Sequence, residues 1–254
     1  MSQFNQALAD KAPLLGTFIK TPHPHNTEVL SQLGFNTLCL DAEHAPFGRA
    51  DLDSCILAAR ANQQHVIVRI PNDHHDTILN ALDLGADGIV VPHVKTPQQL
   101  EKVIANSYYG HNGRGYAGST RMASYTTSAI DKNLAHNKAN TTIIAQIEDL
   151  DALDCLDEIC EVEGLHCLFI GRMDLTVALG ETNPNAPIVI ETVEKIVATA
   201  NKYGVTTGMF IANLDELEQW LEQKVSLFLL GSDHSFMLAG ARNLQARFEQ
   251  AKNG

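Results

Sequence analysis

The sequence predicts an α/β protein that folds as a (β/α)8 TIM barrel, in one domain over residues 1–254. Two observations lead to this fold class. Short apolar runs rich in β-branched residues recur about eight times, and segments with helical spacing lie between them. The length of 254 residues also suits eight strand–helix units. A doubly wound open sheet is the alternative, because periodicity alone does not show whether a sheet closes.

The apolar runs are the predicted strands, and each is five or six residues long, as buried strands usually are. In chain order they cover residues 14–19, 35–40, 65–70, 88–92, 142–147, 166–170, 205–210 and 225–230. No linker, repeat or low-complexity stretch interrupts the alternation. We therefore expect a single barrel domain.

Spacing and capping signals identify helices between these runs. Two clear sets of apolar residues recur every three or four positions: Leu52, Ile56 and Ala59, and Leu214, Leu217 and Leu221. Thr96 and Pro97, with Gln99 following, predict a capped helix start. Asn213 and Glu216 predict another cap and capping-box partner, before the second apolar set.

Composition limits the partners and the compartment. The chain carries 18 Lys+Arg against 30 Asp+Glu, a net charge of −12. This charge argues against nucleic acid and anionic membranes, because phosphates are bound by clustered cations. No apolar run reaches the about 20 residues of a membrane span, and the N-terminus lacks a secretion signal. The five cysteines form no CxxC pair and indicate reduced core residues of a cytoplasmic protein.

The longest segment predicted to be irregular runs from about residue 108 to residue 140. Segments of this length usually have a function or contact another subunit. Residues 113–118 formally match GxGxxG, but the match follows a helix, and no acidic residue stands about 20 positions on after a second strand. We interpret these residues as loop glycines and reject a dinucleotide site.

Polar side chains gather where the predicted strands end, which is where barrel enzymes hold their chemistry. Gln146 and Glu148 are two positions apart, so they share one side of the fifth strand, while Ile147 faces the helices. Asp174 follows the neighbouring sixth strand. Glu148 and Asp174 can therefore converge, and two carboxylates without clustered Cys or His suit a hard ion such as Mg²⁺ or Mn²⁺.

Three further residues are candidates for substrate and proton chemistry. Arg69, at the end of the third strand, can bind the carboxylate of a keto acid with a forked contact, or it can form a buried ion pair. His44 follows Asp41 and Glu43 at the end of the second strand and is a candidate base or an exposed loop histidine. Asp83 lies near a helix C-terminus, where the helix dipole disfavours a carboxylate. This position indicates a partner for Asp83, such as a histidine, or a solvated helix end.

Several stretches, taken together, resemble the HpcH/HpaI aldolase family, the class II pyruvate aldolases. They are residues 16–20, 34–46, 68–71, 82–94, 145–148 and 169–175, so the resemblance covers nearly the whole chain. It implies a (β/α)8 barrel enzyme that cleaves 2-keto-4-hydroxy acids reversibly into pyruvate and an aldehyde. It also implies a homo-oligomer, a hexamer or trimer, in which a C-terminal helix at about residues 236–252 is exchanged between subunits.

The resemblance assigns a role to each candidate residue. Glu148 and Asp174 match the ligands of a divalent metal, Mg²⁺ or Mn²⁺, with Co²⁺ and Zn²⁺ as further candidates. Arg69 matches the arginine that holds the keto acid and its developing enolate.

Four other positions complete the implied site. His44 matches the active-site base and Asp83 its carboxylate partner. Gln146 matches a pocket residue near the metal, and Asp41 an acidic substrate-binding residue at the end of the second strand.

The chain departs from this family pattern at three places. Gly171-Arg172 stands where many members have Gly-Pro, Gly113-Arg114-Gly115 where many have Arg-Arg-Gly, and His93 where a hydrophobic residue is common. We expect these positions to affect the choice of aldehyde. An extra cation at Arg172 can select a second carboxylate or point outward.

Other functions fit parts of the sequence. Lys20 and Lys95 each follow a strand and are candidates for a Schiff-base aldolase, although that mechanism leaves Glu148 and Asp174 unexplained. A lyase acting on an acyl-CoA needs a basic patch that this acidic chain lacks. A non-catalytic barrel that binds a keto acid is the alternative from another class.

Overall fold

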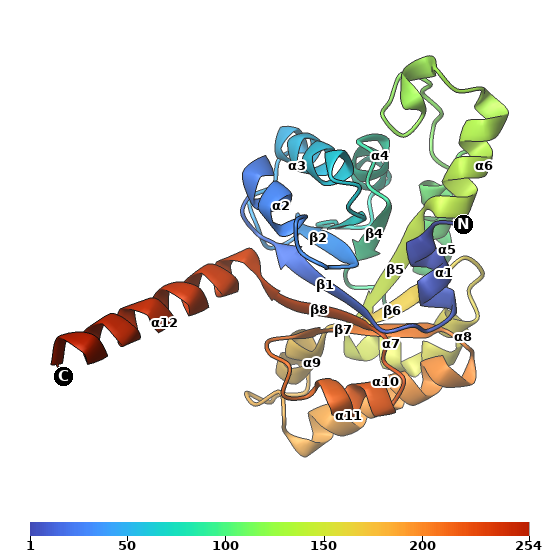
Figure 1. Cartoon of the computed structure of the whole chain (residues 1–254). Helices are drawn as coiled ribbons and strands as arrows, with labels where there is room; N and C mark the ends of the chain where they lie inside the picture. Colours follow the sequence, from blue (N-terminus) through green and yellow to red (C-terminus); the bar gives the residue numbers. More distant parts are fainter. Residues whose placement is uncertain (254) are drawn as a thin grey trace.

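The computed structural model describes residues 1–253, and its eight strands close into one parallel barrel in chain order (Figure 1). The strands are β1 (Leu14–Ile19), β2 (Thr37–Asp41), β3 (Val66–Arg69), β4 (Gly88–Val91), β5 (Thr142–Ile147), β6 (Cys167–Ile170), β7 (Thr206–Ile211) and β8 (Leu227–Ser232). Because β1 pairs with both β2 and β8, the predicted barrel is confirmed and the open sheet is excluded. Every strand begins and ends within two residues of its predicted bounds.

Helices surround the barrel and α12 extends away from it (Figure 1). They are α1 (Gln3–Ala9), α2 (Pro24–Leu30), α3 (Arg49–Ala61), α4 (His75–Asp83), α5 (Pro97–Ser107), α6 (Ile130–Asn140), α7 (Leu150–Asp154), α8 (Leu156–Cys160), α9 (Arg172–Ala178), α10 (Pro187–Lys202), α11 (Leu217–Glu222) and α12 (Asp233–Asn253). Thr96 caps α5 as predicted, because its hydroxyl accepts a hydrogen bond from the Gln99 backbone N–H at 3.2 Å. None of the helices described within residues 1–253 has the length and apolar character needed to cross a membrane.

Apolar residues form a core on each side of the strands. On β5, Ile143 packs toward the helices and Ile144 toward the barrel interior, as a period of two requires. Helix α1 closes the interior at the N-terminal ends of the strands with Phe4 and Leu8. The Leu8 carbonyl there accepts a hydrogen bond from Thr206 Oγ1 at 2.6 Å. The opposite, carboxyl ends of the strands are therefore the end at which a site can open.

Two expectations about local structure are wrong. The irregular segment expected over residues 108–140 contains helix α6 and a short 3-10 helix at Ser124–Thr126. Helix α11 begins at Leu217, and not after Asn213, whose side chain instead accepts a hydrogen bond from the Asp215 backbone at 2.9 Å. Glu216, the expected capping partner, turns its carboxylate to Arg172 and to Trp220 Nε1.

The five cysteines are all unpaired, which agrees with the expected reduced state. Four are buried and Cys155 is half-buried. Burial raises the pKa of the Cys160 thiol to about 12. These side chains pack in the core.

Candidate active site

A cavity of about 450 Å³ opens at the carboxyl ends of the strands. Its wall includes Lys20 after β1, Arg69 on β3, Gln146 on β5, Asp174 on α9, and His44 in the loop after β2. Phe18 and Phe169 contribute apolar surface. The structure thus brings most of the predicted site residues to one pocket, at the end of the barrel where chemistry was expected.

Arg69, which lines this cavity, forms a buried ion pair with Asp41. They face each other because the last residues of β2 and β3 are in register. Arg69 Nε donates to Asp41 Oδ1 at 3.0 Å and Nη2 donates to Oδ2 at 2.8 Å. Burial alone raises the pKa of the Asp41 carboxyl, but the hydrogen bond and charge of Arg69 outweigh it and hold the pKa low.

Arg69 is therefore an ion-pair residue and a pocket residue at once. Its guanidinium lies 4.7 Å above the Phe18 ring centroid, and Nη1 donates no hydrogen bond to any residue of the range 1–253. Lys20 Nζ lies 3.4 Å from Asp41 Oδ2 and adds a second cation to the same wall. Together these cations suit an anionic ligand.

Glu148 lies directly behind the cavity wall, almost fully buried. Its Oε2 accepts a hydrogen bond from Gln146 Nε2, and its Oε1 accepts one from the His93 backbone N–H at 2.8 Å. Ile147 packs among the helices, so the expected alternation of these three residues is confirmed. Burial, and then the nearby charge of Asp174, raise the pKa of the Glu148 carboxyl. Gln146 Oε1 is buried and has no hydrogen-bond partner among residues 1–253.

Glycine is required next to Glu148 because of close packing. A Cβ atom on Gly171 would lie 2.5 Å from Glu148 Cβ and 2.6 Å from its Oε2. Asp174 lies one turn further on, in the first turn of α9, and is exposed to the cavity. Gly171 thus lets the β6–α9 connection pass against Glu148 and brings Asp174 near it.

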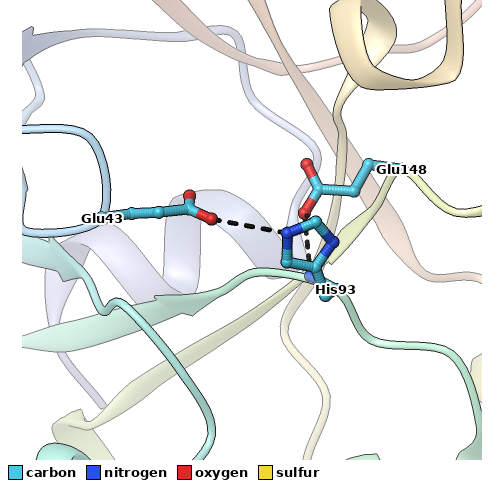
Figure 2. Close-up of side chains that lie close together, drawn as sticks. All are labelled: Glu43, His93 and Glu148. Carbon is cyan, nitrogen blue, oxygen red and sulfur yellow. Dashed lines mark hydrogen bonds and ion pairs between the residues drawn. The ribbon is translucent and has the colours of Figure 1, made fainter. Parts of the chain in front are cut away.

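The ligand atoms that converge most closely belong to a group the sequence analysis did not single out. One ligand atom each from Glu43, His93 and Glu148 lies within 4.8 Å of the others (Figure 2). Within residues 1–253, no such three-residue group includes Asp174. Two features of the sequence point to these residues: the Asp-Ala-Glu-His run, which contains Glu43, and the unusual His93. Their contact was not predicted because they lie far apart in the sequence.

The pKa values of Glu43 and His93 are both raised in this group. Burial raises the pKa of the Glu43 carboxyl, although the charges of Arg69, His44 and His93 act in the other direction. Burial also acts to lower the pKa of the His93 imidazole. Its hydrogen bond to Asp149 and the charges of the surrounding carboxylates raise that pKa above its usual value.

His44 and Asp83 are not brought together. His44 is exposed at the rim, with Nε2 3.7 Å from Glu43 Oε2, and its backbone N–H donates to Asp41 at 3.1 Å. Asp83 pairs with Arg114 Nη1 at 3.2 Å, so its partner in the single chain is an arginine and not the expected histidine.

Arg114 reaches Asp83 from the long segment after α5. Its side chain is fully buried, and its guanidinium lies 4.1 Å from the Tyr109 ring centroid. Burial raises the pKa of Asp83, although the Arg114 charge acts to lower it. This segment therefore packs on the end of α4.

Arg172, the departure from the family pattern, is held by its own chain. Its Nε donates to the Pro184 carbonyl at 2.9 Å, and its other nitrogens donate to Glu216 and Asn185. Its guanidinium also lies 5.9 Å from the Trp220 ring centroid. Arg172 thus stabilises one wall of the cavity through these hydrogen bonds, and the Glu216 carboxylate neutralises the charge of Arg172.

The sequence of the whole chain is similar to those of known proteins. A family model described as HpcH/HpaI aldolase/citrate lyase matches residues 14–239. The chain belongs to this family. Its relatives include the 5-keto-4-deoxy-D-glucarate aldolase of Shigella boydii, 30% identical over 251 residues, which is 98% of this chain and 97% of the relative. The predicted family and the carbon–carbon lyase class of its members are thereby confirmed.

Solved structures of similar proteins have the same fold. An HpcH/HpaI family protein from Burkholderia cenocepacia is 27% identical, with a TM-score of 0.93, over 98% of this chain and 100% of that one. The citrate synthase SbnG is 26% identical, with a TM-score of 0.88, over 98% of both chains. SbnG is named a citrate synthase, whereas the relative from Shigella boydii is named an aldolase.

Proposed function

We propose that this HpcH/HpaI family enzyme cleaves a 2-keto-4-hydroxy acid reversibly into pyruvate and an aldehyde, with the help of a divalent metal ion. One observation carries the proposal. Arg69, Gln146 and Asp174 line a single cavity at the carboxyl ends of the strands, and Glu148 lies directly behind Gln146. The similarity to a 5-keto-4-deoxy-D-glucarate aldolase supports a keto diacid as substrate, whose aldehyde product carries the second carboxylate.

The residues around Glu148 fit a hard metal ion. Glu148 and Asp174 would supply carboxylate oxygens, and the buried Gln146 Oε1 beside them has no hydrogen-bond partner within residues 1–253. Oxygen ligands of this kind suit Mg²⁺ or Mn²⁺. Burial, and then the charge of Asp174, raise the pKa of Glu148, and the charge of a divalent cation would act in the other direction. When bound, the ion supplies a Lewis acid for the keto oxygen of the substrate.

Arg69 binds and orients the keto acid. Asp41 holds Nε and Nη2 of the guanidinium, which leaves Nη1 to donate to the substrate. This fixed positive charge stabilises the negative charge that develops on the keto oxygen as the bond between C3 and C4 breaks. The apolar faces of Phe18 and Phe169 keep water away from the reacting carbon.

His44 is the proposed proton carrier. Its imidazole lies at the rim of the cavity, where it takes the proton of the substrate 4-hydroxyl and returns it in the direction of synthesis. Glu43 Oε2 lies 3.7 Å from His44 Nε2. We keep Asp83 as a proposed support for this step, although it contacts Arg114 in the single chain.

A coupled assay tests the proposal. Metal-stripped protein is mixed with 5-keto-4-deoxy-D-glucarate, and released pyruvate is measured with lactate dehydrogenase and NADH. We expect activity with Mg²⁺ or Mn²⁺, none with EDTA, and none in Glu148→Gln. The exposed His75→Gln is the matched control. Activity that survives EDTA, with borohydride trapping pyruvate on Lys20 or Lys95, would instead support the Schiff-base mechanism.

We further propose that the enzyme is a homo-oligomer, a trimer or hexamer, in which α12 packs on a neighbouring copy. The helix extends away from its own barrel (Figure 1). Met237, Leu238, Leu244 and Phe248 are each more than half exposed along it. Large apolar side chains concentrated on one element typically mark an interaction surface.

A further inference from the structure

A three-residue group with mixed nitrogen and oxygen atoms lies beside the proposed Glu148–Asp174 pair. Glu43, His93 and Glu148 follow the ends of β2, β4 and β5, and Figure 2 shows both carboxylates reaching toward the imidazole. One ligand atom from each residue lies within 4.8 Å of the other two, and His93 Nε2 is 3.7 Å from Glu43 Oε1. Two atoms that each lie about 2.1 Å from one ion are at most about 4.2 Å apart. The three ligand atoms are therefore close to the separation that binding one cation requires.

Asp149 holds the imidazole in the orientation that a metal ligand needs. Its Oδ2 lies 2.9 Å from His93 Nδ1. Because a carboxylate only accepts hydrogen bonds, Nδ1 carries the hydrogen, and Nε2, 3.7 Å from Glu43 Oε1, is the ring nitrogen available to a metal ion. Histidines that bind metals commonly donate their other N–H to a carboxylate in this way.

Glu43 is a buried carboxylate with one oxygen directed toward the imidazole. Its side chain is only 9% exposed, and Oε1 lies 3.7 Å from His93 Nε2. The other oxygen, Oε2, is buried without a hydrogen bond within residues 1–253 and lies 3.3 Å from Arg69 Nε. Oε1 is therefore the oxygen that can bind a cation beside His93.

The local charges favour a cation. The carboxylates of Asp41, Glu43, Glu148 and Asp149 carry four negative charges, and the side chains of Arg69, Lys20 and Lys95, which form ion pairs among them, carry three positive charges. One negative charge therefore remains to attract a bound cation. The site is open to solvent, because the His93 side chain is 54% exposed.

We propose that Glu43, His93 and Glu148 bind a transition-metal ion of the Zn²⁺ or Co²⁺ class, at a site distinct from the Glu148–Asp174 pair. The imidazole nitrogen favours such ions over Mg²⁺. Glu148 serves the two sites through different oxygens: Oε1 faces His93, whereas Oε2 faces Gln146 and Gly171. The proposal shares Glu148 with the proposed function but does not depend on turnover.

Cobalt binding tests the proposal on the full-length, metal-stripped protein. Co²⁺ is titrated by calorimetry in excess Mg²⁺, which occupies sites made only of oxygen ligands. Proton NMR is recorded in parallel. A histidine bound to Co²⁺ through Nε2 gives a strongly shifted, exchangeable signal from its Nδ1–H. We expect this signal and one Co²⁺ per chain in the wild type.

The variants separate this site from its neighbours. His93→Asn should lower the affinity for Co²⁺ at least tenfold and remove the shifted signal. Asparagine suits this position because residue 93 has a φ of 53°, and His93→Gly serves as a second variant. Asp149→Asn should weaken binding about 10–100-fold. The exposed His75→Asn is the matched histidine control and should bind as the wild type does.

Two results would overturn the proposal. One is unchanged Co²⁺ affinity in folded His93→Asn or His93→Gly. The other is loss of the bound Co²⁺ in Asp174→Asn but not in the His93 variants, which would place the ion on the Glu148–Asp174 pair. Pyruvate release is not part of this measurement, so failure of the proposed aldolase reaction would be seen separately.

Discussion

A single methyl group at Gly171 should disable the site without unfolding the barrel. The added Cβ would lie 2.5 Å from Glu148 Cβ, whereas carbon atoms pack at about 3.5–4.0 Å. Glu148 or the start of α9 must therefore move by roughly 1 Å. A displacement of this size at a reacting centre lowers the rate about 100-fold, equivalent to about 2.8 kcal/mol of activation free energy.

The assay for Gly171→Ala combines the rate of pyruvate formation with Mn²⁺ binding followed by electron paramagnetic resonance. We expect both to fall, while the free energy of unfolding drops by only about 1–3 kcal/mol. Gly34→Ala is the control, because a Cβ there meets nothing within 4 Å. A folded Gly171→Ala protein with the wild-type rate and Mn²⁺ affinity would refute the placement of Glu148 in the site.

Three further predictions concern binding, pH and assembly. Arg69→Lys keeps the positive charge but loses the pair of hydrogen bonds from the guanidinium to Asp41. The rate of pyruvate formation in steady-state assays should therefore fall about 100-fold or more. Burial lowers the pKa of His65 to about 4. Between about pH 6.5 and pH 4, His65 is therefore protonated in the unfolded chain but not in the folded chain. The free energy of unfolding falls by about 3 kcal/mol as the pH falls across this range. Urea titrations should show this loss in the wild type and not in His65→Gln. Leu244→Asp on exposed α12 should lower the mass measured by light scattering while leaving the barrel folded.

Short-range patterns predicted the barrel well. Apolar runs such as residues 142–147 locate the strands, because a strand buried on both faces needs apolar residues almost throughout. The period of two then placed Gln146 and Glu148 on one side and Ile147 on the other. Arg69, predicted at the end of the third strand, lines the pocket.

Short-range sequence patterns did not predict which residues from distant segments contact each other. Glu43 and His93 meet only because β2 and β4 end at the same rim, and Asp83 meets Arg114 only because the segment after α5 folds back. Helix α6 was missed because the residues that it buries, Asn133 and Asn137, are polar and give no apolar period.

The most direct test of the account is deuterium exchange at the methyl group of pyruvate, followed by NMR in D₂O. It isolates half of the proposed reaction and needs no knowledge of the aldehyde. The account predicts exchange with Mg²⁺ or Mn²⁺ that is abolished by EDTA, by Arg69→Ala and by Glu148→Ala. Exchange that persists at the same rate in EDTA or in the folded Glu148→Ala variant would contradict it.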